Sequence, residues 1–136
     1  MDRRYHYTSE LDLKDIKRSC RLKPSKLGTF GHGVYLTDLA PTPNRLAISR
    51  AIWGWWNWPK MEAYVGFPYD QIEMHVTTNP RIWLVTGGSL SLTGLDVGIG
   101  YWGGADSTDE NDPGNWDHEA FSACNPPASE LLMRSG

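Results

Sequence analysis

Two short motifs in the first forty residues hold the side chains best suited to chemistry. One is Arg4-Tyr5-His6-Tyr7-Thr8, in which a histidine stands among aromatic residues, and the other is Phe30-Gly31-His32-Gly33-Val34-Tyr35-Leu36-Thr37-Asp38. Histidine and tyrosine can both donate and accept hydrogen bonds, and a tyrosine ring can stack on a flat ligand. The two glycines allow a tight loop that a ligand could approach closely, although a turn leading into a buried strand would use the same residues.

In their order and spacing, the two motifs resemble the diphtheria-toxin-like branch of the ADP-ribosyltransferases. Within that branch they are most similar to the toxin-type family named for its His-Tyr-Asp signature, and the poly-ADP-ribose polymerases carry a similar glycine-flanked loop. The detailed resemblance covers roughly residues 3 to 58, and a looser match in strand order extends to about residue 97. The resemblance implies an α+β fold, an ADP-ribosyltransferase-like split β-sandwich with two short helices.

The resemblance also implies a chemistry in which NAD is the co-substrate and no metal takes part. Nicotinamide leaves the ribose through an oxocarbenium-like transition state, which the protein must stabilise. His6 would be the catalytic histidine that bonds the ribose hydroxyls, and Tyr35 the catalytic tyrosine that stacks on nicotinamide. The cofactor would also be held by backbone groups and one hydroxyl, at Tyr7, Thr8, Gly31 and Gly33.

The third residue of such sites, a carboxylate that faces the nicotinamide ribose, has no clear counterpart. In the polymerase relatives this acid opens the strand after the long excursion, which here is Ile82–Val85, preceded by Asn79-Pro80-Arg81 without an acid. Folding could bring another acid to the cleft, and the candidates are Asp38, Asp70, Glu73, Asp96 and Glu119. If none reaches the ribose, the chain would bind NAD without transferring anything.

The elements that position the motifs follow from local patterns. Tyr5–Thr8 is predicted as a strand, and Ser9 as the N-cap of a helix over Glu10–Cys20 whose apolar stripe faces a sheet. Val34–Thr37 has the composition of a short strand. A second helix should follow Pro41-Thr42-Pro43-Asn44 and end near Trp56 or Asn57, because Pro59 stops it.

Further strands are predicted at Glu62–Phe67, Ile72–Val76, Ile82–Val85 and Leu90–Leu92. From Gly98 onward the glycines predict an irregular Gly/Asp-rich loop at about residues 98–115 within one domain of residues 1–136.

Composition limits the kinds of protein that the chain can be. The net charge of −3 does not favour sequence-independent DNA binding, and no apolar run approaches the roughly 18 residues of a membrane span. Two cysteines allow one bridge at most, and Cys20 is predicted as a buried free thiol. The chain is expected in the cytoplasm, or in a target cell's cytoplasm as a delivered toxin domain.

The sequence therefore favours a toxin- or effector-type NAD-dependent ADP-ribosyltransferase or NAD glycohydrolase. Its partners would be a macromolecular acceptor, protein or nucleic acid, and an immunity or inhibitor protein, with no membrane. The alternative is a non-catalytic NAD- or protein-binding module on the same fold, for which the tryptophan cluster of residues 53–58 would form a platform. An RNA 2′-phosphotransferase is less favoured, because that family relies on several arginines together with the histidine. The candidates here, Arg3, Arg4 and Arg81, are too few.

Overall fold

The computed structural model describes residues 3–25, 31–42, 44–70, 72–101 and 117–121, without the side chains of residues 117–119. Mostly antiparallel strands and two helices confirm the α+β class. In chain order the elements are β1 (Arg3–Thr8), α1 (Glu10–Ser19), β2 (Arg21–Leu22), β3 (Val34–Thr37), α2 (Arg45–Trp53), the 3₁₀ helix η1 (Trp58–Lys60), β4 (Ala63–Pro68), β5 (His75–Val76), β6 (Ile82–Val85), β7 (Leu90–Ser91), β8 (Val97–Tyr101) and β9 (Asp117–Phe121).

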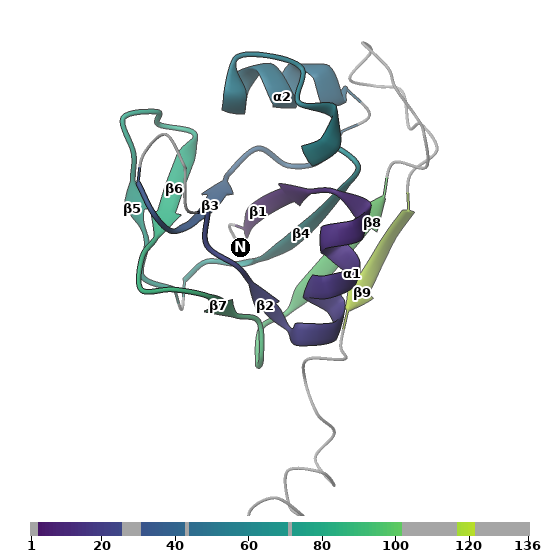
Figure 1. Cartoon of the computed structure of the whole chain (residues 1–136), viewed down its shortest axis with the longest axis vertical. Coiled ribbons are helices and arrows are strands. Elements are labelled where there is room, and N and C mark those ends of the chain that lie inside the picture. The colour runs from purple at the N-terminus through teal and green to yellow at the C-terminus, as the bar shows by residue number, and fades with distance from the viewer. Residues whose placement is uncertain (1–2, 26–30, 43, 71, 102–116, 122–136) are drawn as a thin grey trace, which may run out of the picture.

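Seven of these strands form one antiparallel sheet in the order β5-β6-β3-β1-β4-β8-β9, and β2 pairs with β7 in a separate two-stranded sheet. Figure 1 shows β1 and β4 beside β8 and β9, with β3, β6 and β5 on the other side of β1.

The seven-stranded sheet is nearly divided between β1 and β3. β1 pairs with β4 along its whole length, through six register pairs from Arg3↔Pro68 to Thr8↔Ala63. It pairs with β3 at one position, Tyr5↔Thr37. Strands β1 and β3 therefore diverge, and most of the space between them is not bridged by a ladder of backbone hydrogen bonds.

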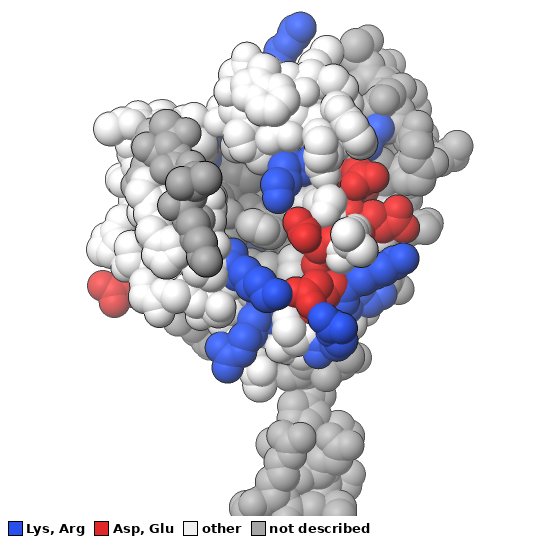
Figure 2. Space-filling model, in the orientation of Figure 1, with Lys and Arg blue, Asp and Glu red and all other residues white. Residues whose placement is uncertain are grey.

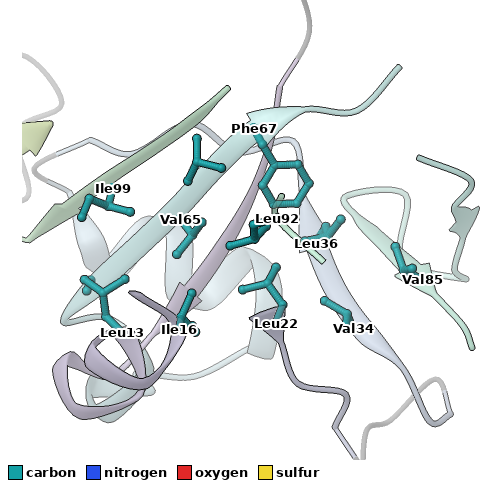
Figure 3. Close-up of a cluster of buried hydrophobic side chains, with 12 residues drawn as sticks. Leu13, Ile16, Leu22, Val34, Leu36, Val65, Phe67, Val85, Leu92 and Ile99 are labelled. Carbon is teal, nitrogen blue, oxygen red and sulfur yellow. The ribbon is translucent and has the colours of Figure 1, made fainter. Parts of the chain in front are cut away.

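Each face of the sheet carries its own core, because successive residues of a strand point to opposite faces. On one face, Val65 of β4 packs with Leu13 and Ile16 of α1 in the larger cluster, drawn in Figure 3. On the other face, Tyr64 packs with Ile48 of α2 in a smaller cluster that also contains Tyr7 and Met61. The two helices thus cover different faces of the strands that diverge.

The ends of both helices follow from their capping residues. Ser9 Oγ accepts a hydrogen bond from the Asp12 N–H at 3.1 Å, which confirms the predicted start of α1. The prediction that the second helix ends near Trp56 or Asn57 was wrong. Gly54 adopts the left-handed conformation at φ 80° and its N–H bonds to the Arg50 carbonyl, which ends α2 at Trp53, before Pro59 can act.

Three further predictions were wrong. Residues 98–101, expected in an irregular loop, belong to strand β8, which is held between β4 and β9; residues 102–115 of that loop lie outside the described residues. The strand expected at Ile72–Val76 is reduced to the exposed edge strand His75–Val76. Cys20 is disulfide-bonded rather than a free thiol, and it caps α1 at φ 56° instead of lying on the helix face; the chain's other cysteine, Cys124, is outside the described residues.

Candidate functional site

A cavity of about 340 Å³ opens where the sheet divides. Residues 5–8 of β1 and residues 35–37 of β3 line it from the two diverging strands. Ile16 of α1 and Trp53 of α2 close it from the two faces of the sheet. Figure 2 shows this face of the molecule with a hollow, and acidic and basic side chains gathered along its α1 side.

The two residues predicted as catalytic, His6 and Tyr35, line this one cavity. His6 Nδ1 lies 3.0 Å from the Tyr35 carbonyl oxygen, so the histidine ring reaches across to the diverging strand. A carbonyl oxygen can only accept, so Nδ1 carries the proton and donates. The side chain thereby bonds to a backbone group of β3 across the gap between the two strands.

The environment of His6 keeps its ring neutral. Burial lowers the pKa of His6 below its ordinary value of 6.5, and the hydrogen bond to the Tyr35 carbonyl offsets this only in part. With Nδ1 protonated and the ring neutral at pH 7, Nε2 is left as a hydrogen-bond acceptor. Such a nitrogen suits a ligand hydroxyl.

Tyr35 is tied to the loop before it. Its hydroxyl donates to the Gly31 carbonyl at 2.5 Å, and Gly31 has a φ of 109°, which favours glycine. Gly31 itself does not line the cavity, whereas Gly33 does. A Cβ at Gly33 would lie 2.6 Å from the Val85 carbonyl oxygen, so this glycine permits the close approach of β6.

Tyr7 and Thr8, predicted to hold the cofactor, line the cavity but are both buried, with exposed fractions of 5% and 1%. The Tyr7 hydroxyl donates to the Leu39 carbonyl at 2.6 Å, and burial raises the pKa of this tyrosine. The Tyr7 ring is therefore part of the smaller core cluster, and a ligand contact through its backbone stays a prediction.

The candidate acids that the structure describes are not at this cavity. None of Asp38, Asp70, Glu73 and Asp96 lines it, and the Glu119 side chain lies outside the described part of the chain. Asp38 pairs with Arg81 at 3.0 Å at the opening of β6, and Asp96 pairs with Arg3 at 3.5 Å. The position where the resemblance implies an acid thus holds an arginine and its partner.

Two other acids, both missed from the sequence, do line the cavity. Asp12 and Asp15 of α1 lie at its rim, where Asp12 pairs with Lys60 at 3.4 Å and Asp15 with Lys23 at 2.8 Å. The sequence did not single them out, because the face of α1 that meets the cavity is known only from the folded chain; there Asp12 shares a helix face with Ile16, four residues on, which also lines the cavity.

Of the tryptophans at 53–58 and the arginines at 3, 4 and 81, on which the alternative functions depend, Trp53 alone lines the cavity. Of the tryptophan cluster, Trp53 reaches the cavity, while Trp55 and Trp58 are exposed at 56% and 61%. Arg4 is buried, with its guanidinium 4.0 Å from the Tyr69 ring and 4.1 Å from the Trp83 ring. None of Arg3, Arg4 and Arg81 lines the cavity, which leaves the 2′-phosphotransferase alternative without its arginines there.

Comparison with known proteins adds no further constraint: no protein-family model, curated protein or solved structure matches the chain. Among the described residues, no three or more His, Cys, Asp or Glu side chains are grouped so that they could hold a metal ion. None of the described helices has the length and apolarity to cross a membrane.

Proposed function

We propose that the chain is an NAD-dependent ADP-ribosyltransferase of the toxin or effector type, which passes ADP-ribose to a macromolecular acceptor or to water. One observation carries the proposal. His6 and Tyr35, selected from two motifs far apart in the chain, line one cavity and are joined by a hydrogen bond across the divided sheet.

The reaction breaks the bond between the ribose C1′ and the nicotinamide nitrogen. The bonding electron pair leaves with nicotinamide, which becomes neutral, and a lone pair of the acceptor forms the new bond to C1′ while the acceptor's proton passes to solvent. Between these events the ribose carries positive charge, so groups that favour a cation there accelerate the step.

Each residue has a role that its surroundings support. His6 Nε2 accepts a hydrogen bond from a ribose hydroxyl, and the Tyr35 ring stacks on nicotinamide at the strand opposite. Ligand pockets commonly measure about 300–1,000 Å³. The 340 Å³ here fits the nicotinamide riboside half of NAD, with the adenosine half lying outside.

Two features of the fold support the assignment to a toxin-type enzyme with a split β-sandwich fold. The division between β1 and β3 is what a split β-sandwich with a dinucleotide in its cleft requires. The disulfide at Cys20 supports an exported toxin domain rather than a resident cytoplasmic protein, because disulfides persist mainly in oxidising compartments.

The direct test is incubation with NAD labelled in both halves, followed by measurement of free nicotinamide and of label on candidate acceptors. His6→Ala and Tyr35→Ala should each lower nicotinamide release by roughly 10² or more. His32→Ala is the matched control, because His32 is exposed, stands between the two glycines and does not line the cavity. If the wild-type chain releases no nicotinamide and modifies no acceptor, the proposal is rejected.

A second candidate function is a non-catalytic NAD- or protein-binding module. The Arg81–Asp38 pair at the opening of β6, where the resemblance implies an acid, favours it, as does the exposure of Trp55 and Trp58. Quenching of Trp53 fluorescence by NAD without release of nicotinamide would select this function over the first.

A further inference from the structure

The rim of the cavity carries two ion pairs of unlike character. Among the described residues, the carboxylates and ammonium groups that line the cavity are Asp12, Asp15, Lys23 and Lys60. Asp15 is held by two cations, since Arg18 also bonds to it, and these side-chain hydrogen bonds lower the pKa of Asp15. Asp15 is therefore fixed in place by its neighbours.

Asp12 is held much less firmly. Its ion pair with Lys60 is long at 3.4 Å, and the two side chains are exposed at 55% and 47%. Exposed pairs of this kind contribute little to stability, so exchanging one partner for another costs little free energy. Asp12 and Lys60 are thus the pair at this rim that a charged ligand can separate.

The same pair lies near enough to His6 for its charges to act on the imidazole. Lys60 and Asp12 are the two charged side chains whose fields act on the imidazole, with Lys60 lowering the pKa of His6 and Asp12 raising it. Both also line the cavity directly. Asp12, Lys60 and His6 thus line one cavity, so a ligand that fills it can meet all three side chains.

We propose, building on the NAD-cleaving function above, that Asp12 supplies the carboxylate that β6 lacks, and that Lys60 exchanges its carboxylate partner for the ligand's diphosphate. NAD carries both signs of charge, with anionic phosphates and a cationic nicotinamide ribosyl end. One member of the ion pair suits each end. The exchange frees Asp12 to face the ribose as it becomes a cation, in a site where a bound ligand excludes water and strengthens the interaction.

The first experiment compares nicotinamide release and ADP-ribose affinity in Asp12→Asn, Asp15→Asn and Glu10→Gln. Asp12→Asn should lower nicotinamide release by roughly 10² while ADP-ribose affinity stays within about threefold of wild type. Asp12→Glu should recover part of the loss. Glu10→Gln is the matched control, because Glu10 is an exposed acid in the same first turn of α1 that does not line the cavity. Unimpaired turnover in Asp12→Asn, or an equal or larger loss in Asp15→Asn, overturns the assignment.

A second experiment separates failure of this assignment from failure of the proposed function. Asp12 should make the wild-type chain bind NAD⁺ more tightly than NADH, because only the former carries the positive nicotinamide ring, and Asp12→Asn should abolish most of that preference. Calorimetry measures this without any turnover. If the wild-type chain releases no nicotinamide, the function fails and the preference alone decides the role of Asp12. A preference that survives in Asp12→Asn, or a wild-type chain that binds neither dinucleotide, overturns it.

Discussion

The two edges of β1 are built for different purposes. Along the β4 edge, six register pairs form a continuous ladder, and Ala63, Val65 and Phe67 of the partner strand have no exposed surface. Along the β3 edge, one register pair remains and a cavity fills the gap. One strand thus contributes to the most regular part of the fold and to its candidate site.

The difference explains how a cavity can exist at the centre of a small sheet. Opening a ladder leaves backbone groups without partners, which is costly when they are buried. His6 meets this need at the Tyr35 carbonyl with its side chain, while the β4 edge keeps β1 in place. A site built on such a strand is positioned more firmly than one built on a loop.

The largest effect is expected at the closed edge. Phe67→Ala removes a fully buried ring from the main core and should lower the free energy of unfolding by about 3–5 kcal/mol. Denaturant titration measures the loss, and Val76→Ala, at an exposed position on β5, should stay within about 0.5 kcal/mol of wild type. A small loss of stability in Phe67→Ala would show that the β4 edge of β1 is not more stable than the β3 edge.

A smaller loss of stability is expected when a glycine at either edge of β1 is replaced by alanine. Gly33→Ala would place a methyl group 2.6 Å from the Val85 backbone oxygen, and we expect it to cost about 1–3 kcal/mol. Gly66→Ala in β4 meets the Tyr5 ring at 2.8 Å, but a side chain can move aside, so it should cost less. Thermal unfolding of both variants checks the order. If Gly66→Ala proved the more damaging, the packing of Tyr5 rather than of β6 would control this part of the sheet.

Tyr35→Phe tests how the open edge is held in shape. The change removes the hydrogen bond from the Tyr35 hydroxyl to the Gly31 carbonyl, which should cost about 0.5–1.5 kcal/mol of stability. Because the ring remains, nicotinamide release should fall less than in Tyr35→Ala. Equal losses of turnover in the two variants would mean that the hydroxyl, through its hold on the glycine loop, matters more than stacking.

Elements that depend on neighbouring residues could be predicted from the sequence, whereas elements that depend on contacts with distant strands could not. The start of α1 was predictable because Ser9 and Asp12 form the cap within four residues, and β3 because its composition alone favours a strand. Strand β8 was not, because Gly98 and Gly100 weaken any local signal and the strand is held by β4 and β9, which are distant in sequence.

Within the candidate site, the motif residues could be selected from the sequence but their charged surroundings could not. His6 and Tyr35 stand in recognisable patterns, and both line the cavity. Asp12 lies in the first turn of α1, where its N–H bonds to the Ser9 cap, and nothing in α1 itself says which of its faces meets the gap between β1 and β3. That depends on how Leu13 and Ile16 pack against β4 and its neighbours, which only the folded chain determines.

The smallest expected effect is the pH dependence of the free energy of unfolding, which His6 of β1 should cause. The unfolded chain takes up a proton at His6 near pH 6.5, whereas burial makes the folded chain do so only at a lower pH. Between these values the unfolded state holds more protons, so the free energy of unfolding should fall as the pH is lowered through 6.5. His6→Gln should flatten this dependence between about pH 7.5 and 5.5, while His75→Gln, at an exposed position of β5, should leave it in place. Denaturant titrations at several pH values provide the measurement. An equally steep fall in His6→Gln would mean that the imidazole is not held neutral by the strands around it, and the acceptor nitrogen on which the proposed chemistry depends would be lost with it.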